Sequence, residues 1–338
     1  MENVRLIYEQ IEVAKGHLLG TSLLGLRLAL ILSDNVAELL MHQELKLRFR
    51  IDDEWRPKWE PAYTEWLRAG GPAPKYTLEE RQAAEREFEP KTRILCLHMG
   101  RLSSEERGIL NVCHKLRNEA FHRGTLRSKI LEQVCRLLYI TVVNLTLKFP
   151  VRGFTLPGPT PATDDANFLE RFDLKDAFSL ATDDGRRKLA DRLLVGIAFD
   201  GLAFAETLSH DLVERIDATL GGLEYVGETS DRSQIDRKLQ YTQFWRDLGA
   251  ALVKQGVREP DLENAYRRWQ SEGRARYTLH KIDRWRRQAA SIARCATPAR
   301  ALDHYWAIDK KLRPLEDDVF EAVFRYDEEI DLRLHDRR

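Results

Sequence analysis

The chain is poor in cysteine and in the local patterns that mark β-strands. It has four cysteines in 338 residues, none in a Cys-x-x-Cys arrangement, which favours reduced thiols over a disulfide framework. Alternation of β-branched and polar residues is nearly absent, so we expect no extensive sheet. Glycine (19) and proline (12) are both infrequent, and no repeat of fixed period is visible. The sequence therefore predicts an all-α protein.

Long apolar runs and a net charge are also lacking. The most apolar runs are 18–32 and 134–147, and each contains an arginine. Both are shorter than the roughly 20 apolar residues that a membrane-spanning helix needs. The N-terminus lacks the basic and then apolar layout of a signal peptide. We therefore expect a cytoplasmic protein with no membrane partner. Because the formal net charge is +0, any binding of nucleic acid must come from local patches.

Helical periodicity is what the sequence has in abundance. Residues 1–150 carry apolar side chains at three- and four-residue spacing, which predicts an antiparallel helical bundle. Thr77-x-x-Glu80 and Ser103-x-x-Glu106 have the pattern of capping boxes and predict two helix starts.

Composition divides the rest of the chain. Residues 51–78 are rich in aromatic residues and proline, and they predict an irregular insertion in the bundle. Residues 151–166 have the Pro- and Gly-rich composition of a linker. Helical patterns resume over 167–338, which we expect to form a second helical domain with a regulatory or partner-binding role.

One stretch, Cys113 to Gly124, gathers an arginine, an asparagine and two histidines within ten residues. Arginine binds phosphate through a planar fork, and histidine moves protons near neutral pH. Arg117 and His122 straddle the expected end of a helix, because Gly124 is typical of the position just after one. An unwinding last turn would bring the two side chains together. Similar Arg-to-His spacings occur elsewhere in the chain, so this placement, and not the spacing, is what distinguishes the pair.

The pattern Arg117-Asn118-x-x-x-His122, at the end of one helix and before a long apolar one, resembles the signature of the HEPN superfamily. The preceding pair of helices, with the segment Ser33 to Leu40, is similar to that family as well. The resemblance covers about residues 1–150. It implies a HEPN-like all-α bundle and a metal-independent endoribonuclease, of the kind found in toxin–antitoxin, CRISPR-linked and phage-defence systems. The insertion and the C-terminal half depart from a minimal HEPN domain.

The resemblance also implies roles for individual residues. Arg117 and His122 become catalytic residues, and Asn118 becomes the polar residue that follows the arginine. The substrate is RNA, cleaved by attack of its 2′-hydroxyl, and neither a cofactor nor a metal is needed. HEPN domains usually bring two copies of the motif together in one cleft, so we expect a homodimer. An antitoxin or regulatory protein is a further expected partner.

Each of these residues also has a structural interpretation. For Arg117 and His122 we favour the catalytic interpretation, and the alternative is a structural helix cap or a non-catalytic phosphate site. For Asn118, supporting the Arg/His geometry and plain C-capping weigh the same. His114 lies one helical turn before Arg117, and its pattern favours a partly buried helix residue over a second proton shuttle.

The neighbouring charged residues also have both a functional and a structural interpretation. Glu119 and Arg123 are possible substrate contacts, but their pattern favours surface charges. Asp34 and Glu38, on the second predicted helix, would line the same cleft from the other side. A solvated helix face is the interpretation that we favour for them.

A zinc site was considered from the pairs Cys96-x-His98 and Cys113-His114, which together supply two sulfurs and two imidazoles. Adjacent residues on a helix project about 100° apart. Cys113 and His114 are therefore poorly placed to share one ion, and we predict no metal site.

The second half contains a basic segment. Residues 267–294 carry nine Lys and Arg against two acids, interleaved with Trp269, Tyr277 and Trp285. Such a segment suits tracking of a nucleic-acid backbone. Residues 316–331 hold eight acids against one base, so the two segments would also suit pairing within the fold. The eight-residue spacing of the aromatics is that of a buried stripe, and we favour packing.

Three functions follow from these observations. The first is a HEPN-type ribonuclease that acts as a toxin or defence effector. The second is a non-catalytic HEPN-like protein, a scaffold or binding module whose Arg/His cluster holds a nucleotide or RNA. The third is a helical regulator unrelated to HEPN proteins.

Overall fold

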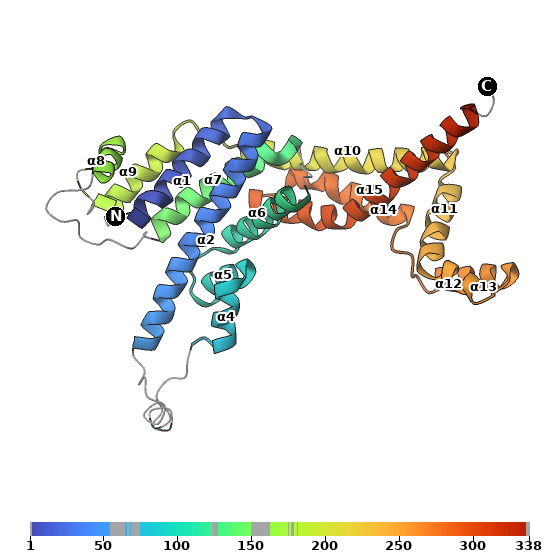
Figure 1. The fold of residues 1–338 in the computed structure, drawn as a ribbon, viewed down its shortest axis with the longest axis horizontal. Coiled ribbons are helices and arrows are strands. Elements are labelled where there is room, and N and C mark those ends of the chain that lie inside the picture. The colour runs from blue at the N-terminus through green and yellow to red at the C-terminus, as the bar shows by residue number, and fades with distance from the viewer. Residues whose placement is uncertain are drawn as a thin grey trace. The chain divides into compact units, whose positions relative to one another are not determined.

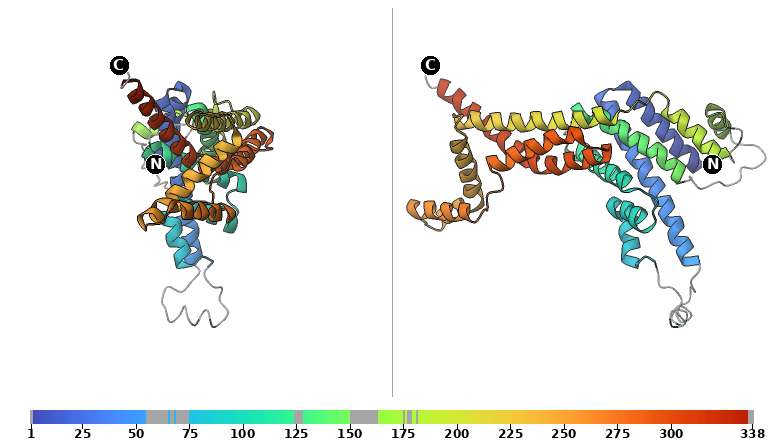
Figure 2. Two further views of the ribbon diagram at one scale, coloured as in Figure 1. Left: turned by 90° about the vertical axis from the view of Figure 1, so that its right-hand side faces the viewer. Right: turned by 180° about the vertical axis from the view of Figure 1, so that it is seen from behind.

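The computed structural model describes residues 2–54, 75–123, 128–149, 163–174 and 182–335, with residues 65, 68, 176, 179 and 180 between them. Every regular element in these ranges is a helix, so the all-α prediction is confirmed for them (Figures 1 and 2). The chain divides into two compact units, Met1–Gly201 (unit 1) and Leu202–Arg338 (unit 2).

The helices of unit 1 are α1 (Glu2–Gly20), α2 (Leu23–Glu54), α4 (Leu78–Arg86), α5 (Phe88–Arg93), a π-helical turn η1 (Ile94–His98), α6 (Ser104–Arg123), α7 (Ser128–Lys148), α8 (Thr163–Arg171) and α9 (Asp183–Leu194). Those of unit 2 are α10 (Gly201–Gly227), α11 (Arg232–Phe244), a π-helical turn η3 (Trp245–Gly249), α12 (Ala250–Lys254), α13 (Glu259–Ser271), α14 (Leu279–Ser291), a 3₁₀ turn η4 (Ile292–Arg294) and α15 (Pro298–His335).

Both predicted capping boxes are present in unit 1. The Thr77 hydroxyl accepts a hydrogen bond from the Glu80 backbone N–H at 3.1 Å, and the Thr77 N–H donates to the Glu80 carboxylate at 3.0 Å. Ser103 and Glu106 make the same reciprocal pair at 3.1 and 2.8 Å. Each pair satisfies two backbone donors that a helix start leaves open, and the second box fixes where α6 begins.

Helix α2 is the axis of unit 1. Its N-terminal part packs against α1 and α7, and its C-terminal part packs against α5 and α6 (Figure 1). The core between these helices is apolar and includes Ile11, Leu30, Val36 and Leu138, each at most 1% exposed. Residues near the middle of α2 therefore face both the bundle and α6, which is where the candidate site lies.

Helix α7 is long and apolar enough to span a membrane by length and composition, and it is the one such helix in the described ranges. It is also a core helix, because 67% of its most apolar window is buried inside the protein. A buried helix of this kind is what the core of a soluble protein contains.

The division between the units lies further along the chain than the linker that composition predicts. Residues 151–162 lie outside the described residues, and α8 and α9 beyond them pack against α1, with α9 also on α7. The buried Tyr139 hydroxyl donates a 3.0 Å hydrogen bond to the Leu193 carbonyl. The contacts thus place residues up to Gly201 with unit 1. The predicted insertion at 51–78 lies mostly outside the described residues, and α2 continues through its beginning to Glu54.

In unit 2, α10 and α15 run parallel and α14 runs antiparallel to α10. Asp211 of α10 accepts a hydrogen bond from Tyr305 of α15, and Tyr225, further along α10, donates to Asp327, further along α15. Arg215 lies between the two helices, 2.9 Å from the fully buried Asp309. Burial alone lowers the pKa of the Arg215 guanidinium, but its hydrogen bond to Glu316 and the surrounding acids raise it above the ordinary value.

The predicted packing of the basic segment's aromatic residues is confirmed, although they do not share one helix. Trp269 on α13 is 3% exposed and packs with Phe244 of α11. Tyr277 and Trp285 are 2% and 8% exposed and contact each other edge to face. The sequence also suited pairing of this basic segment with the acidic residues 316–331. The described ion pairs instead join Glu316 to Arg215 and Asp318 to Arg246, and both arginines lie outside the basic segment.

Candidate active site

A buried carboxylate lies where α2 crosses α6. The side chain of Asp34 is 0% exposed, although it was expected on a solvated helix face. That expectation is wrong because α6 and the bundle cover this side of α2. A charge so placed is strongly unfavourable unless it has partners of opposite charge or good hydrogen bonds. Asp34 has both, and they come from the stretch around Arg117.

His114 is the first partner of Asp34. Its Nδ1 lies 3.1 Å from Oδ1 and 3.0 Å from Oδ2 of Asp34. An ionised carboxylate only accepts hydrogen bonds, so with Asp34 ionised Nδ1 is the donor and Nε2 is the ring nitrogen left for other contacts. Phe88 of α5 stacks on the imidazole with ring centroids 3.9 Å apart and planes within 10°. The ring is therefore held in one plane, with 19% of the side chain exposed.

Arg117 is the second partner. Its Nε lies 3.2 Å from Oδ2 of Asp34, an ion pair without a well-aligned hydrogen bond. Its Nη1 donates to the Asn118 side-chain oxygen at 2.8 Å. A quarter of the side chain remains exposed. The guanidinium is thus fixed on one edge by a buried carboxylate and an amide, and it keeps N–H donors for an anion that approaches from solvent.

Further polar contacts hold α5 against α2 and α6. The Lys91 side chain is 2% exposed and its ammonium lies 3.0 Å from Glu38 of α2. Glu38 was also expected on a solvated face, and its carboxylate is partly exposed but paired. The Thr92 hydroxyl donates to the Asn111 side-chain oxygen of α6 at 3.0 Å. These contacts fix the position of Phe88 and, through it, of His114.

Two of the predicted site residues are described by their backbone alone. Helix α6 continues to Arg123, so the expected unwinding before His122 does not occur. The side chains of His122 and Arg123, and all of Gly124, lie outside what the structure describes. Glu119 is half-buried on the same helix. The structure thus brings together Arg117, Asn118 and His114, while the pairing of Arg117 with His122 stays a prediction.

Cys113 is one of the two cysteines that a zinc site built from the sequence pairs would use. Burial raises the pKa of the Cys113 thiol well above its usual range, and Cys135 and Asp34 add to the effect. A thiol in that state is a poor nucleophile and a poor ligand. Within the described ranges, no three His, Cys, Asp or Glu side chains are grouped so as to hold a metal ion.

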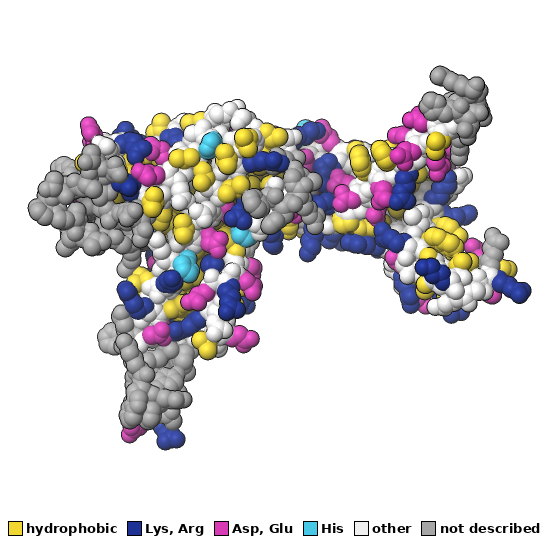
Figure 3. Space-filling model, viewed as in Figure 1, with side chains coloured by type: hydrophobic (Ala, Val, Ile, Leu, Met, Phe, Trp, Pro, Cys, Tyr) yellow, Lys and Arg dark blue, Asp and Glu magenta, His cyan; other side chains and the backbone are white. Residues whose placement is uncertain are grey.

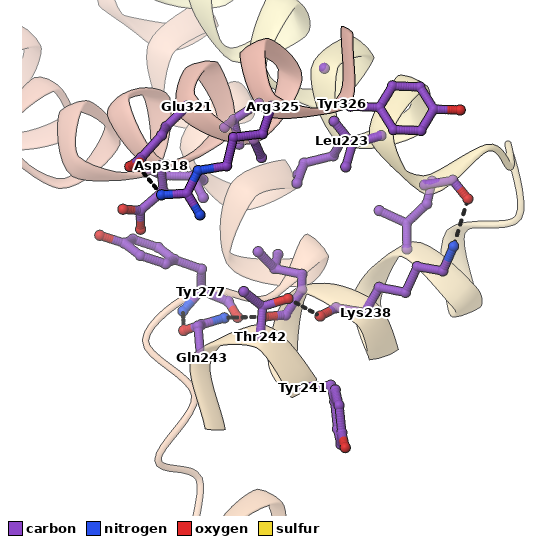
Figure 4. A pocket seen from close by; sticks show the side chains of 18 of the residues that line it. Leu223, Lys238, Tyr241, Thr242, Gln243, Tyr277, Asp318, Glu321, Arg325 and Tyr326 are labelled. Carbon is purple, nitrogen blue, oxygen red and sulfur yellow. Dashed lines mark hydrogen bonds and ion pairs between the residues drawn. The ribbon is translucent and has the colours of Figure 1, made fainter. Parts of the chain in front are cut away.

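Unit 2 contains a cavity of about 590 Å³ between α10, α11 and α15 (Figure 4). Its charged residues are largely neutralised by their neighbours: Arg246 pairs with Asp318, Arg325 pairs with Glu321, and the Lys238 ammonium donates to a backbone carbonyl. The remaining lining is mainly apolar and aromatic. This cavity suits packing of an apolar group better than chemistry on a charged substrate. The site formed by Asp34, His114 and Arg117 is therefore the stronger candidate for an active site.

Searches of protein-family models, of characterised proteins and of solved structures found no match to this chain.

Asp34 was named from the sequence as a possible cleft residue, but its burial and its contacts with His114 and Arg117 were not predicted. The one signal for it is its position inside the apolar segment Leu28 to Leu40, where a carboxylate is unexpected on a purely core-facing helix. Its partners lie 80 or more residues away, and no local pattern identifies them.

Proposed function

We propose that this protein is a metal-independent endoribonuclease of the HEPN type. The observation that carries the proposal is the Arg117 guanidinium, which is held by the buried Asp34 and by Asn118 on a side chain that is 25% exposed. An arginine held in this way is preorganised for a phosphodiester, because its remaining donors need no rearrangement to meet phosphate oxygens. His114 and His122 stand on the same helix as candidate proton carriers.

In the proposed cleavage of RNA, each side chain of the site has a defined role. The RNA 2′-oxygen attacks phosphorus and loses its proton to an imidazole, while the bond from phosphorus to the 5′-oxygen breaks and that oxygen gains a proton. The products are a 2′,3′-cyclic phosphate and a 5′-hydroxyl. Arg117 stabilises the charge that builds on the non-bridging oxygens. His122 is the catalytic proton carrier, and Asn118 positions Arg117.

A single histidine cannot easily take one proton and give another in the same step. We therefore propose that two copies of the chain form a homodimer that brings their motifs into one cleft. Such an enzyme acts in the cytoplasm as a toxin or phage-defence effector, restrained by an antitoxin or regulatory partner. If the protein cleaves RNA while sedimenting as a monomer, the dimer part of this proposal is wrong.

The test is incubation of purified protein with mixed RNA in the presence of EDTA. We expect cleavage by the wild type, with activity reduced about 10²–10³-fold in Arg117→Ala and about 10²–10⁴-fold in His122→Ala. Arg93→Ala and His98→Ala are the matched controls, since they repeat the same spacing on α5 and η1. Loss of activity in the controls, or its dependence on an added metal, would contradict the proposal.

A non-catalytic role is the alternative. The observation that favours it is that two of the three nitrogens of Arg117 already face partners within the protein, as in an ion pair that joins two helices. A scaffold of this kind would bind a nucleotide or RNA without cleaving it. Binding that is lost in Arg117→Ala, with no cleavage by the wild type, would identify this role.

A further inference from the structure

Helix α14 has two sharply different faces. Ile282, Trp285 and Ala289 are buried against the rest of unit 2. The opposite face is exposed and carries Arg284 and Arg287, and the 3₁₀ turn η4 adds Arg294. Positions 284, 287 and 294 recur at spacings of three and seven residues, so they fall on one side of the helix.

We call these three side chains the α14 ridge. Figure 3 shows Lys and Arg side chains gathered along the edge of unit 2 where Figure 1 labels α14. The ridge spans ten residues, which is about 15 Å along a helix. Its three charges therefore lie within reach of several consecutive phosphates of one strand.

The ridge differs from Arg286, the other arginine of α14, in having no acidic partner among the described residues. Arg286 of α14 is 2.6 Å from Asp217, and the one acid of α14, Asp283, is 2.6 Å from Arg232. None of the three ridge arginines has a carboxylate partner among the described residues. No described carboxylate therefore pairs with these three positive charges, although the formal net charge of the whole chain is +0.

We propose that the α14 ridge binds the phosphate backbone of a single-stranded RNA. The identity of the ligand as RNA rests on the proposed function. Arginine forks match phosphate oxygens in pairs, and three of them on one straight face form an electrostatic track. A lipid surface fits less well, because a helix that binds a bilayer inserts its apolar face, and the apolar face of α14 is buried in the protein.

The structure also indicates what kind of binding to expect. Trp269, Tyr277 and Trp285, which lie in the same basic segment, are all buried, so no aromatic side chain among them is available to stack on bases. Binding by the ridge is therefore electrostatic, indifferent to sequence and strongly weakened by salt.

The experiment measures the affinity of the full-length protein for a fluorescently labelled single-stranded RNA by anisotropy, over a series of salt concentrations. All proteins carry Arg117→Ala to prevent cleavage. The test variant adds Arg284→Ala, Arg287→Ala and Arg294→Ala. The control instead adds Lys254→Ala, Arg258→Ala and Arg267→Ala, an equal loss of charge at exposed positions of α12, α13 and the turn between them.

We expect the control to retain both affinity and salt dependence. Three lost phosphate contacts should reduce the slope of log K against log salt by about 2, from roughly 0.7 per contact on a single strand. Between 50 and 200 mM salt the parent should then weaken about 20-fold more than the ridge variant. Thermal unfolding followed by circular dichroism verifies that the ridge variant is folded, since the substitutions are at exposed helical positions.

An unchanged slope and affinity in the ridge variant would overturn the proposal, and so would equal losses in the control. Binding of phosphatidylserine vesicles in preference to RNA would overturn it as well. Cleavage of RNA by the wild type, measured separately, distinguishes the two proposals. A cleaving enzyme whose ridge variant binds normally refutes the ridge alone. A protein that binds RNA through the ridge but never cleaves refutes the ribonuclease alone.

Discussion

The contact between Asp34 and Arg117 makes a quantitative prediction, because the two partners are buried to different extents. Asp34 is 0% exposed and the Arg117 side chain is 25% exposed. Removing one partner of a buried ion pair costs about 3–5 kcal/mol when the other charge stays buried. Arg117→Gln leaves the buried carboxylate with His114 as its remaining partner, so we expect a loss within that range.

Asp34→Asn should cost less, about 2–3 kcal/mol, because the Arg117 charge that it leaves behind is partly exposed and regains water. For a unit of about 200 residues, this loss corresponds to a fall in Tm of roughly 4–12 °C. The double variant should lose less than the sum of the two single losses, by about 2 kcal/mol, since either substitution alone already breaks the pair.

Urea unfolding followed by circular dichroism measures all three losses. The matched control is the exposed pair of Arg107 and Glu89, whose side chains approach to 2.7 Å at the surface. There we expect a coupling below about 1 kcal/mol. Additive losses for Asp34→Asn and Arg117→Gln, or a coupling no larger than that of the control pair, would refute the buried-pair geometry on which the site depends.

Three further predictions concern residues outside the Asp34 cluster. Burial raises the pKa of the Glu106 carboxyl, but hydrogen bonds from Lys148 and from a backbone N–H outweigh it and hold the pKa below its ordinary 4.5. Glu106→Gln should therefore lower Tm at neutral pH, and the difference should vanish as the pH falls below 4.5, since protonation removes the same stabilisation from the wild type; a difference that persists in acid would contradict this. Burial raises the pKa of the Cys135 thiol to about 12 and that of Cys113 well above its usual range, so thiol reagents should label both cysteines only after unfolding, as peptide mapping by mass spectrometry would detect. Asp309 is fully buried with two arginine partners that are themselves partly exposed, so Asp309→Asn should destabilise unit 2 by about 2–3 kcal/mol, as for Asp34→Asn; calorimetry should show a lower transition for that unit, and the proposed RNA cleavage by the folded protein should be unaffected.

The helical part of the fold follows from local sequence signals. Three- and four-residue apolar spacing predicts helices in both units, and the two capping boxes mark helix starts that the structure contains. Such features depend on a few neighbouring residues, so the sequence is sufficient to find them.

The candidate site could be predicted in part only. The clustering of Arg117, Asn118 and His114 on one helix is visible from spacing, but the burial of Asp34 depends on how α2 meets α6. A carboxylate on a helix is solvated or buried according to what packs over it, and its partners here are separated from it by more than 70 residues. The same limit explains why the acids of 316–331 were expected to contact the basic segment, when Asp318 in fact pairs with Arg246.

The central claim is that Arg117 acts on an RNA phosphodiester that is broken by its own 2′-hydroxyl. It is tested most directly with one oligonucleotide sequence in two forms, with ordinary riboses and with 2′-O-methyl riboses, both incubated in EDTA with wild type and Arg117→Ala. We expect the wild type to cleave only the unmodified RNA and to leave 2′,3′-cyclic phosphate ends, and we expect Arg117→Ala to cleave neither form. Cleavage of the 2′-O-methyl RNA by the wild type, or full activity in Arg117→Ala, would contradict it.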